Sequence, residues 1–236
     1  MKLNTNSNSY IIAYASLTVV VVAFILAFVF QILKPLQEKN VSLDKKRQIL
    51  AALNIRDIDN NQVEAEYKSI IEADEVLDSQ NKIILPGQAG GESDGFKLDG
   101  GDNKKGKLAL FVCKVNNQKK FVIPVYGMGL WGNISGYIAI NEDKETIYGV
   151  YFNHESETAG LGAEIKDNRK WQEQFKGKHL FSGNSKDKIA LSICKKVDNP
   201  SPNQVDGVTG ATLTCDGVNN MLHDGIAKYL VFLKNK

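Results

Sequence analysis

The sequence reads LALFVCKV at residues 108–115, and four similar runs follow it: KFVIPVY (120–126), SGYIAIN (135–141), TIYGVYFN (146–153) and KIALSIC (188–194). Each run is short, rich in β-branched and aromatic residues, and separated from the next by polar residues, a pattern typical of β-strands. Residues 214–233 differ, because their apolar positions repeat at steps of three and four, which predicts an amphipathic helix. We therefore expect an α+β fold in which helices pack on an antiparallel sheet.

The segment before these runs is predicted to be largely helical. Apolar residues at helical spacing indicate one helix of about three turns near residues 42–53 and a second over roughly 61–77. A polar, helix-like piece lies at 166–175. Residues 86–107 hold seven of the twenty glycines and few apolar residues, which predicts a mobile loop.

The N-terminal part contains one long apolar run. From Tyr10 to Leu33, 24 residues pass without a charge, and a helix of that length spans about 36 Å, enough to cross a bilayer core. A cleaved signal peptide would have a shorter apolar run and a small-residue cleavage site, so we interpret this run as an uncleaved membrane anchor. The predicted organisation is a tail (1–9), a transmembrane helix (10–33), a membrane-proximal helical section (34–85), a Gly-rich loop (86–107) and a C-terminal domain (108–236).

Charge and cysteine content exclude several classes of function. Lys and Arg number 29 against 27 Asp and Glu, a net charge of +2, whereas a nucleic-acid binder would show a basic stripe. The three cysteines, Cys113, Cys194 and Cys215, are odd in number and widely spaced, which argues against a disulfide framework and against a Cys-rich metal centre. The three histidines form no HExxH motif, so we expect no metal site.

A glycine-rich segment follows the 120–126 run. Residues 127–132 satisfy G-x-G-x-x-G, but the dinucleotide-binding fingerprint must open a helix, and here another strand-like run follows. We interpret the segment as a turn in which missing Cβ atoms allow a close approach to a ligand or another strand. Trp131 lies at its centre, where it is either a core residue or a stacking surface; core packing is the expected role.

The loop after the 146–153 run is acidic. Glu155, Glu157 and Glu164 could suggest paired carboxylates for acid–base chemistry, yet nothing in their spacing makes them converge. We expect a solvated loop here. For His154 we expect a hydrogen-bonded structural role rather than that of a metal ligand.

Small and hydroxyl-bearing residues gather at 206–214, directly before the amphipathic helix. Backbone N–H groups and the helix dipole favour an anion at such a position, so the segment could hold a phosphate. An ordinary threonine N-cap fits the same residues, and local physics leaves both interpretations open. A hydrolase that used Thr212 as its nucleophile would need a nearby base, which the sequence does not offer.

Four separated segments resemble one known family. DGVTGAT (206–212) resembles the D-x-x-[ST]-G-A-T signal at which a flavin transferase attaches FMN to the final threonine. GLWG (129–132) and ETAGLGAEI (157–165) resemble flavin-contacting loops of the same domain. Residues 34–53 resemble the section that follows the anchor in the family of C subunits of Na⁺-translocating NADH:quinone oxidoreductases.

The resemblance implies that residues 108–236 form an FMN-binding domain with FMN held covalently, through a phosphoester, on Thr212. Trp131, Leu161 and Leu213 would supply the walls of the flavin slot. The other residues implied in cofactor binding are Thr158, Gly160, Thr209, Gly210, Ala211 and Thr214. No catalytic acid or base is implied, because the flavin itself supplies the electron chemistry.

The implied function is that of an electron-carrying subunit of a sodium-pumping translocase that oxidises NADH and reduces ubiquinone. The implied partners are the other subunits (of A, B, D, E and F type), a flavin transferase and membrane lipid. The resemblance also implies a bacterial inner membrane location with residues 34–236 on the periplasmic side. The charges point the other way, because Lys2 precedes the anchor while five basic residues follow it by residue 47.

Two alternatives remain beside this interpretation. The G subunit of the related ferredoxin-linked Rnf complex shares the attachment signal, although the section at 34–53 favours the first family. A membrane-anchored structural module without redox function is the second alternative. Two positions depart from the family pattern: Ala159 stands where Pro is usual, and Cys215 stands where Ser is usual.

Overall fold

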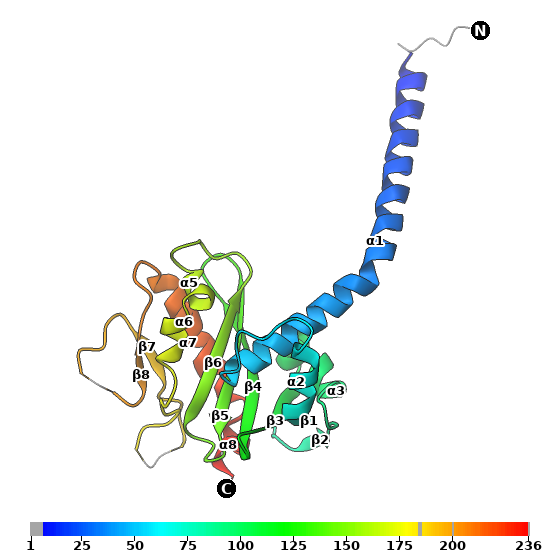
Figure 1. Ribbon diagram of the computed structural model, residues 1–236. Helices are drawn as coiled ribbons and strands as arrows, with labels where there is room; N and C mark the ends of the chain where they lie inside the picture. Colours follow the sequence, from blue (N-terminus) through cyan, green and yellow to red (C-terminus); the bar gives the residue numbers. More distant parts are fainter. Residues whose placement is uncertain (1–6, 184–185, 200, 236) are drawn as a thin grey trace. The chain divides into compact units, whose positions relative to one another are not determined.

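The computed structural model describes residues 7–183, 186–199 and 201–235 and divides the chain into two units, one ending at Lys45 and one beginning at Lys46. Most of the predicted tail (1–9) lies outside the described residues. The second unit contains a sheet with helices on it, so the expected α+β class with an antiparallel sheet is confirmed (Figure 1).

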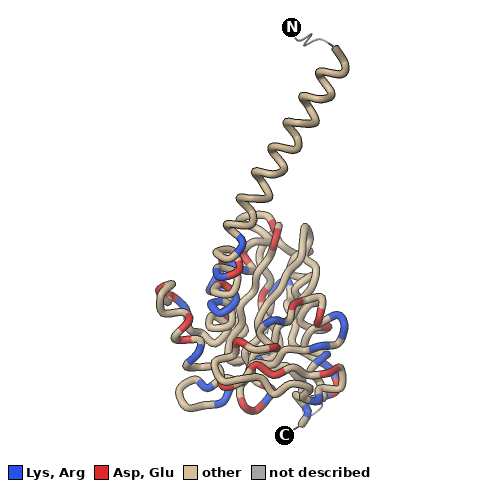
Figure 2. Tube along the Cα trace, turned by 90° about the vertical axis from the view of Figure 1, so that its right-hand side faces the viewer, with Lys and Arg blue, Asp and Glu red and all other residues tan. Residues whose placement is uncertain are grey.

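Helix α1 runs without interruption from Asn8 to Ala52 and contains the predicted transmembrane run. It is long and apolar enough to cross a membrane, its most apolar stretch is not buried, and Figure 2 shows no charged residue along that part. We expected a separate helix after Pro35, but Pro35 lies inside α1. Proline removes one backbone donor and crowds the carbonyl of residue 31, but its φ is helical, and the hydrogen bonds on either side continue the helix.

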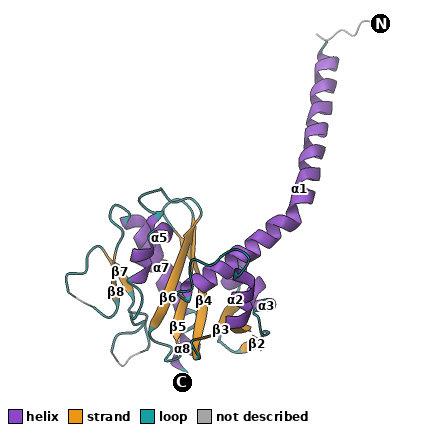
Figure 3. Cartoon of the chain, viewed as in Figure 1, coloured by secondary structure: helices purple, strands orange, loops and turns teal. Residues whose placement is uncertain are grey.

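The main sheet has six antiparallel strands in the order β2-β1-β3-β4-β5-β6 (Figure 3). The strands are β1 (Ile71–Leu77), β2 (Ile83–Leu85), β3 (Leu108–Val115), β4 (Gln118–Met128), β5 (Asn133–Asn141) and β6 (Ile147–His154). Strands β3 to β6 form a meander joined by short turns and coincide with the four runs predicted between residues 108 and 153. The Gly-rich segment between β4 and β5 is thus a turn between strands, as expected.

Two predicted elements of the second unit differ in type or extent from the structure. The helix expected over 61–77 is limited to α2 (Val63–Ile70), and Ile71–Leu77 instead forms β1, because these residues pair with β3 along their length. That pairing outweighs the helical spacing of the apolar residues. The run at 188–194 yields only β7 (Ser192–Cys194), which pairs in parallel with β8 (Gln204–Asp206) outside the main sheet.

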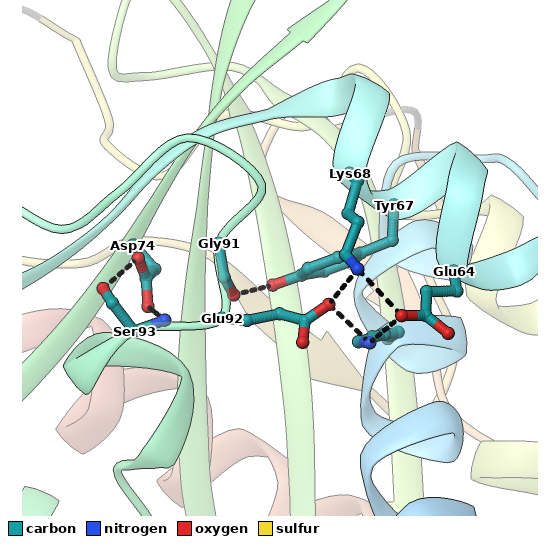
Figure 4. Close-up of polar contacts among 8 residues, drawn as sticks. Glu64, Tyr67, Lys68, Asp74, Gly91, Glu92 and Ser93 are labelled. Atoms are coloured by element: carbon teal, nitrogen blue, oxygen red, sulfur yellow. Dashed lines mark hydrogen bonds and ion pairs between the residues drawn. The ribbon is translucent and has the colours of Figure 1, made fainter.

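The segment 86–107 was predicted to be a mobile loop, but it packs against β1 and contains α3 (Asp94–Lys97) and α4 (Gly100–Lys104). The buried carboxylate of Asp74 organises it by accepting hydrogen bonds from the backbone N–H groups of Gln88 (3.0 Å), Ser93 (2.7 Å) and Phe96 (2.9 Å). Figure 4 shows Asp74 with Ser93 and, near them, the Tyr67 hydroxyl, which donates to the carbonyl of Gly91.

Helix α7 (Thr212–Ala227) covers one face of the sheet and packs mainly against β4 (Figure 1). It begins two residues before the predicted start at 214, and α8 (Leu230–Lys234) forms the end of the predicted helix separately. Glycine permits the close approach, since a Cβ at Gly225 would lie 2.7 Å from Val125 Cγ1. Helices α5 (Glu164–Asp167) and α6 (Arg169–Glu173) contact β6 and occupy the place of the predicted helix-like piece.

The sheet is buried on both faces. Alternate residues of each strand point to opposite sides, so Leu110, Ile123 and Phe152 join the core under α7, which also includes Val218 and Leu222. On the other side, the amide of Asn54 donates to the carbonyl of Tyr148, just after the end of α1. The result is a rigid support for the loops at the end of β4 and the start of α7.

Candidate functional site

Thr212 is the first residue of α7, and its side chain is exposed. The residue at the cap position is Ala211, which offers no side-chain acceptor, so the interpretation of this segment as an ordinary threonine N-cap was wrong. The N–H groups of the first helical turn therefore lack a capping side chain, and a helix start in that state favours a negatively charged group. Gly210, at φ +79°, makes the turn that leads into the helix.

A cavity of about 200 Å³ lies beside Thr212. Its lining brings together the three segments singled out in the sequence. The lining residues are Leu130, Glu157, Thr158, Leu161, Gly162, Gly210, Ala211, Thr212, Leu213 and Thr214. Thr212 also lines a second cavity, of about 210 Å³, together with Thr209 and Cys215.

Not all of the residues expected to bind the cofactor line that first cavity. Gly160 and Thr209 line a neighbouring hollow of about 400 Å³, together with Lys170 and Trp171. Trp131 is 66% exposed, so the expectation that it is a core residue was wrong, and its indole is available as a stacking surface. Thr214 is buried, unlike Thr212.

Exposed apolar side chains gather around this end of the domain. Met128, Leu130 and Trp131 lie at the turn between β4 and β5, and Leu161 and Leu213 line the cavity beside Thr212. Large apolar side chains left in water at neighbouring positions indicate a surface that binds an apolar group. A planar aromatic ring is such a group.

Glu157 is the residue that ties these segments together. Its carboxylate is buried, accepts the hydroxyl of Thr214 at 2.6 Å and accepts the backbone N–H of Trp131 at 2.9 Å. Burial acts to raise the pKa of Glu157, but the hydrogen bonds from Thr214, Trp131 and Leu130 outweigh burial and hold the pKa below its ordinary value. The side chain is thus a carboxylate anion at neutral pH, not the solvated loop residue that we expected.

Glycines make room for this carboxylate in both neighbouring segments. A Cβ at Gly129 would overlap Oε1 of Glu157, and a Cβ at Gly162 would overlap Oε2 of Glu157 and lie 2.6 Å from the Thr214 hydroxyl. Gly129 of GLWG and Gly162 of ETAGLG are therefore needed for close packing around one buried side chain.

The other polar groups of the acidic loop have separate partners. Glu155 is exposed and accepts from the amide of Asn133, while Glu164 lies in α5 and borders the 400 Å³ hollow. Nδ1 of His154 accepts the backbone N–H of Glu157 at 3.2 Å, a structural role as expected. In the parts of the chain that the structure describes, no group of three His, Cys, Asp or Glu side chains is arranged to hold a metal ion.

The two positions that depart from the family pattern do not disturb the site. Cys215 is buried, and its Sγ accepts the backbone N–H of Val208 at 3.2 Å, which stabilises the loop before α7. Burial raises the pKa of the Cys215 thiol. Ala159 is exposed in the loop between Glu157 and Gly162.

The residues present fit FMN. The first turn of α7 offers an exposed hydroxyl and N–H groups for a phosphate, and the exposed Leu161, Leu213 and Trp131 offer apolar contacts for a ring system. The cavity of about 200 Å³ is smaller than the usual range of roughly 300–1,000 Å³ for a ligand pocket. A bound flavin would therefore remain partly exposed, which suits electron exchange with a partner.

Comparisons with known proteins agree with this geometry. A family model described as FMN-binding domain matches residues 129–227, which include both Trp131 and Thr212. The chain is 30% identical to the C subunit of the Na(+)-translocating NADH-quinone reductase of Haemophilus ducreyi, over 99% of this chain and 97% of the relative. It is 33% identical to the corresponding C subunit of Pseudomonas aeruginosa, with 86% of each chain covered.

A solved structure is similar to this chain over most of the length of both. The crystal structure of the C subunit of the Na(+)-translocating NADH-quinone reductase from Parabacteroides distasonis superimposes with a TM-score of 0.75 at 31% identity, covering 86% of this chain and 98% of that one.

Proposed function

Because the chain belongs to the family of Na(+)-translocating NADH-quinone reductase C subunits and contains an FMN-binding domain, we propose that it carries FMN as a phosphoester on Thr212. In this proposal the domain passes electrons within a membrane-bound complex that oxidises NADH and reduces a quinone. The relative from Haemophilus ducreyi matches the anchor and the membrane-proximal section as well as the flavin domain, which favours this family over the Rnf alternative.

The exposure of Thr212 at the start of α7 carries the proposal. Three threonines occur in the segment 206–214, and they differ in environment. Thr214 is buried and its hydroxyl is donated to Glu157, so it is closed to a modifying enzyme. Thr209 is exposed but lies three residues before the helix. Thr212 combines exposure with a helix N-terminus, where a phosphodiester anion is stabilised by the dipole and by free N–H groups.

The chain's own residues bind and orient the cofactor. The first turn of α7 fixes the phosphate end, and Leu161, Leu213 and Trp131 offer apolar contacts to the ring. FMN supplies one- and two-electron transfer when bound, so the protein needs no acid or base of its own. The covalent bond retains the cofactor in a shallow site that could not hold it tightly by contacts alone.

The proposal extends to the surroundings of the domain. Helix α1 serves as a single-pass anchor in the bacterial inner membrane, in contact with lipid, and the flavin domain lies on the periplasmic side. A flavin transferase attaches FMN there. The other subunits of the complex, of A, B, D, E and F type, supply and receive the electrons.

Coexpression of the full chain with a flavin transferase tests the attachment. The denatured chain should fluoresce as a flavoprotein on a gel, and its intact mass should include one FMN. Thr212→Ala should abolish both signals, whereas Thr209→Ala, a matched loss of an exposed hydroxyl in the same loop, should retain them. Fluorescence that persists in Thr212→Ala would disprove the assignment.

A further inference from the structure

A buried negative charge lies in the wall of the cavity beside Thr212, and nothing in the proposed attachment chemistry uses it. We propose that Glu157 is a positioning residue of the flavin site: its carboxylate holds the Gly129–Gly132 turn against the first turn of α7 and places a fixed negative charge beside the flavin. The electrostatic half of this inference, the negative charge beside the flavin, rests on the proposed function. The positioning half, the contact between the turn and α7, concerns the protein without cofactor.

The positioning half follows from contacts across distant parts of the chain. Oε2 of Glu157 accepts the Thr214 hydroxyl at 2.6 Å, and Oε1 accepts the Trp131 N–H at 2.9 Å. Both hydrogen bonds involve a charged acceptor, and such bonds are roughly twice as strong as those between neutral groups. Glu157 therefore joins the turn after β4, its own loop and helix α7 through one side chain.

The surrounding structure is built to admit this side chain. Glu157 is 7% exposed, and the space that a Cβ would occupy at Gly129 and at Gly162 is filled by its two carboxylate oxygens. Removal of the carboxylate would leave a void between the turn after β4, the loop of Glu157 and the first turn of α7. The exposed indole of Trp131 is attached to that turn and would lose its fixed position.

The electrostatic half follows from how the charge is balanced. Within the described residues, hydrogen-bond donors rather than a lysine or arginine partner balance the charge of the carboxylate. Glu157 lines the same cavity as Leu161, Thr212 and Leu213. A negative charge held near a flavin opposes the addition of electrons to it, because the interaction between like charges is strong where water is partly excluded.

Two substitutions separate the two halves. In Glu157→Gln the amide oxygen replaces Oε1 and still accepts from Trp131, while the amide NH₂ replaces Oε2 and donates to the Thr214 oxygen. This variant keeps the shape and the bridge and loses the charge. Glu157→Ala loses both. Glu155→Gln is the matched control, because it makes the same chemical change two residues away on an exposed side chain.

The experiment uses the full chain, purified in detergent after coexpression with a flavin transferase, and measures flavin content and flavin midpoint potential. Glu157→Gln should carry a wild-type content of flavin with a midpoint potential shifted to more positive values, and Glu155→Gln should match the wild type in both. A wild-type potential in Glu157→Gln would overturn the electrostatic half.

The positioning half is measured in a Thr212→Ala background, where no flavin is attached. Trp171 is buried and Trp131 is exposed, so a change in the accessibility of tryptophan to a quencher reports the GLWG turn. Glu157→Ala should increase quenching and lower the Tm, whereas Glu157→Gln should remain close to the Thr212→Ala parent. Equal quenching in the parent and in both Glu157 variants would overturn the positioning half.

Absence of flavin from the wild-type chain would refute the proposed function and, with it, the electrostatic half, while the quenching result would still decide positioning. Should Glu157→Ala fail to fold, Thr214→Val removes one end of the bridge and is read by the same quenching.

Discussion

The hydroxyl of Thr214 donates a 2.6 Å hydrogen bond to Oε2 of Glu157, and both residues are buried. This contact sets Thr214 apart from Thr212, which lies two positions earlier at the exposed helix start. Helical geometry turns residues two positions apart to different sides. One threonine therefore holds the site together, while the other remains available for modification.

Thr214→Val should destabilise the domain without preventing flavin attachment. Valine keeps the shape of threonine but leaves the buried carboxylate without one of its donors, a loss of about 1–3 kcal/mol. Denaturant unfolding of the full chain, followed by the fluorescence of the buried Trp171, measures the change. Thr158→Val, at an exposed position, is the control and should stay within about 0.5 kcal/mol. A fully stable Thr214→Val variant would show that the contact contributes nothing.

Trp131→Ala and Leu161→Ala should retain the fluorescent band on a denaturing gel yet change the absorption spectrum or midpoint potential of the flavin. Both side chains are exposed at the site, so their loss removes apolar contacts to the ring and not the attachment residue. Visible spectroscopy of the purified full chain and a redox titration measure the effect. Val231→Ala, an exposed apolar residue in α8, is the control. Spectra and potentials equal to those of the wild type in both variants would remove Trp131 and Leu161 from the site.

A buried ion pair provides a separate test of the fold. Lys46 is buried and its Nζ lies 2.7 Å from Oε1 of Glu92, near the cluster drawn in Figure 4. Glu92→Ala should cost about 1–3 kcal/mol, because it removes the hydrogen-bonded partner of a buried cation, whereas Lys46→Met should be close to neutral. Unfolding monitored by Trp171 fluorescence measures both. An equal loss in the two variants would contradict this asymmetry, and Lys97→Met, in an exposed pair with Asp94, is the control.

The meander could be predicted from sequence because each strand carries its own signal. The runs from Leu108 to Asn153 are rich in β-branched and aromatic residues, and each one is closed by a turn. Strand β1 was missed because Glu72, Asp74 and Glu75 weaken its strand signal, and the pairing with β3 that decides its structure is not local. For the same reason the Gly-rich segment was expected to be loose, although Asp74 anchors it.

The burial and the contacts of Glu157 could not be predicted from the pattern of residue types in its loop. A glutamate between two other acidic residues in a polar loop is normally solvated, so the sequence alone argued against a central role. The signal that could have found it lies in two glycines, Gly129 and Gly162, which leave the space that it fills. The two glycines are far apart in the sequence, and only the fold shows that both pack against the same carboxylate. Thr212 could be named earlier because the attachment signal is contiguous.

The orientation of the anchor is open to a direct test. We predict that the flavin domain faces the periplasm, against the basic residues that follow Leu33. Alkaline phosphatase fused to the C-terminus should be active. Green fluorescent protein fused to the C-terminus and exported by the same route should be dark. A matched pair of fusions at Ser7, before the helix, should give the reverse pattern. Bright green fluorescence at the C-terminus would show that the charge rule decides the orientation.

Thr212→Ala should assemble into the complex but stop electron transfer to quinone. The side chain is exposed and small, so its loss should not disturb the core or the anchor. Affinity purification through a tag on this chain should recover a complex that oxidises NADH with an artificial acceptor at the wild-type rate, while sodium-dependent quinone reduction falls by at least about 100-fold, because a missing carrier interrupts the chain of cofactors. Thr212→Ser keeps the acceptor hydroxyl and should restore quinone reduction. Unchanged quinone reduction in Thr212→Ala would mean that electrons do not pass through this flavin. Recovery of a complex that exchanges electrons with ferredoxin instead would favour the Rnf alternative.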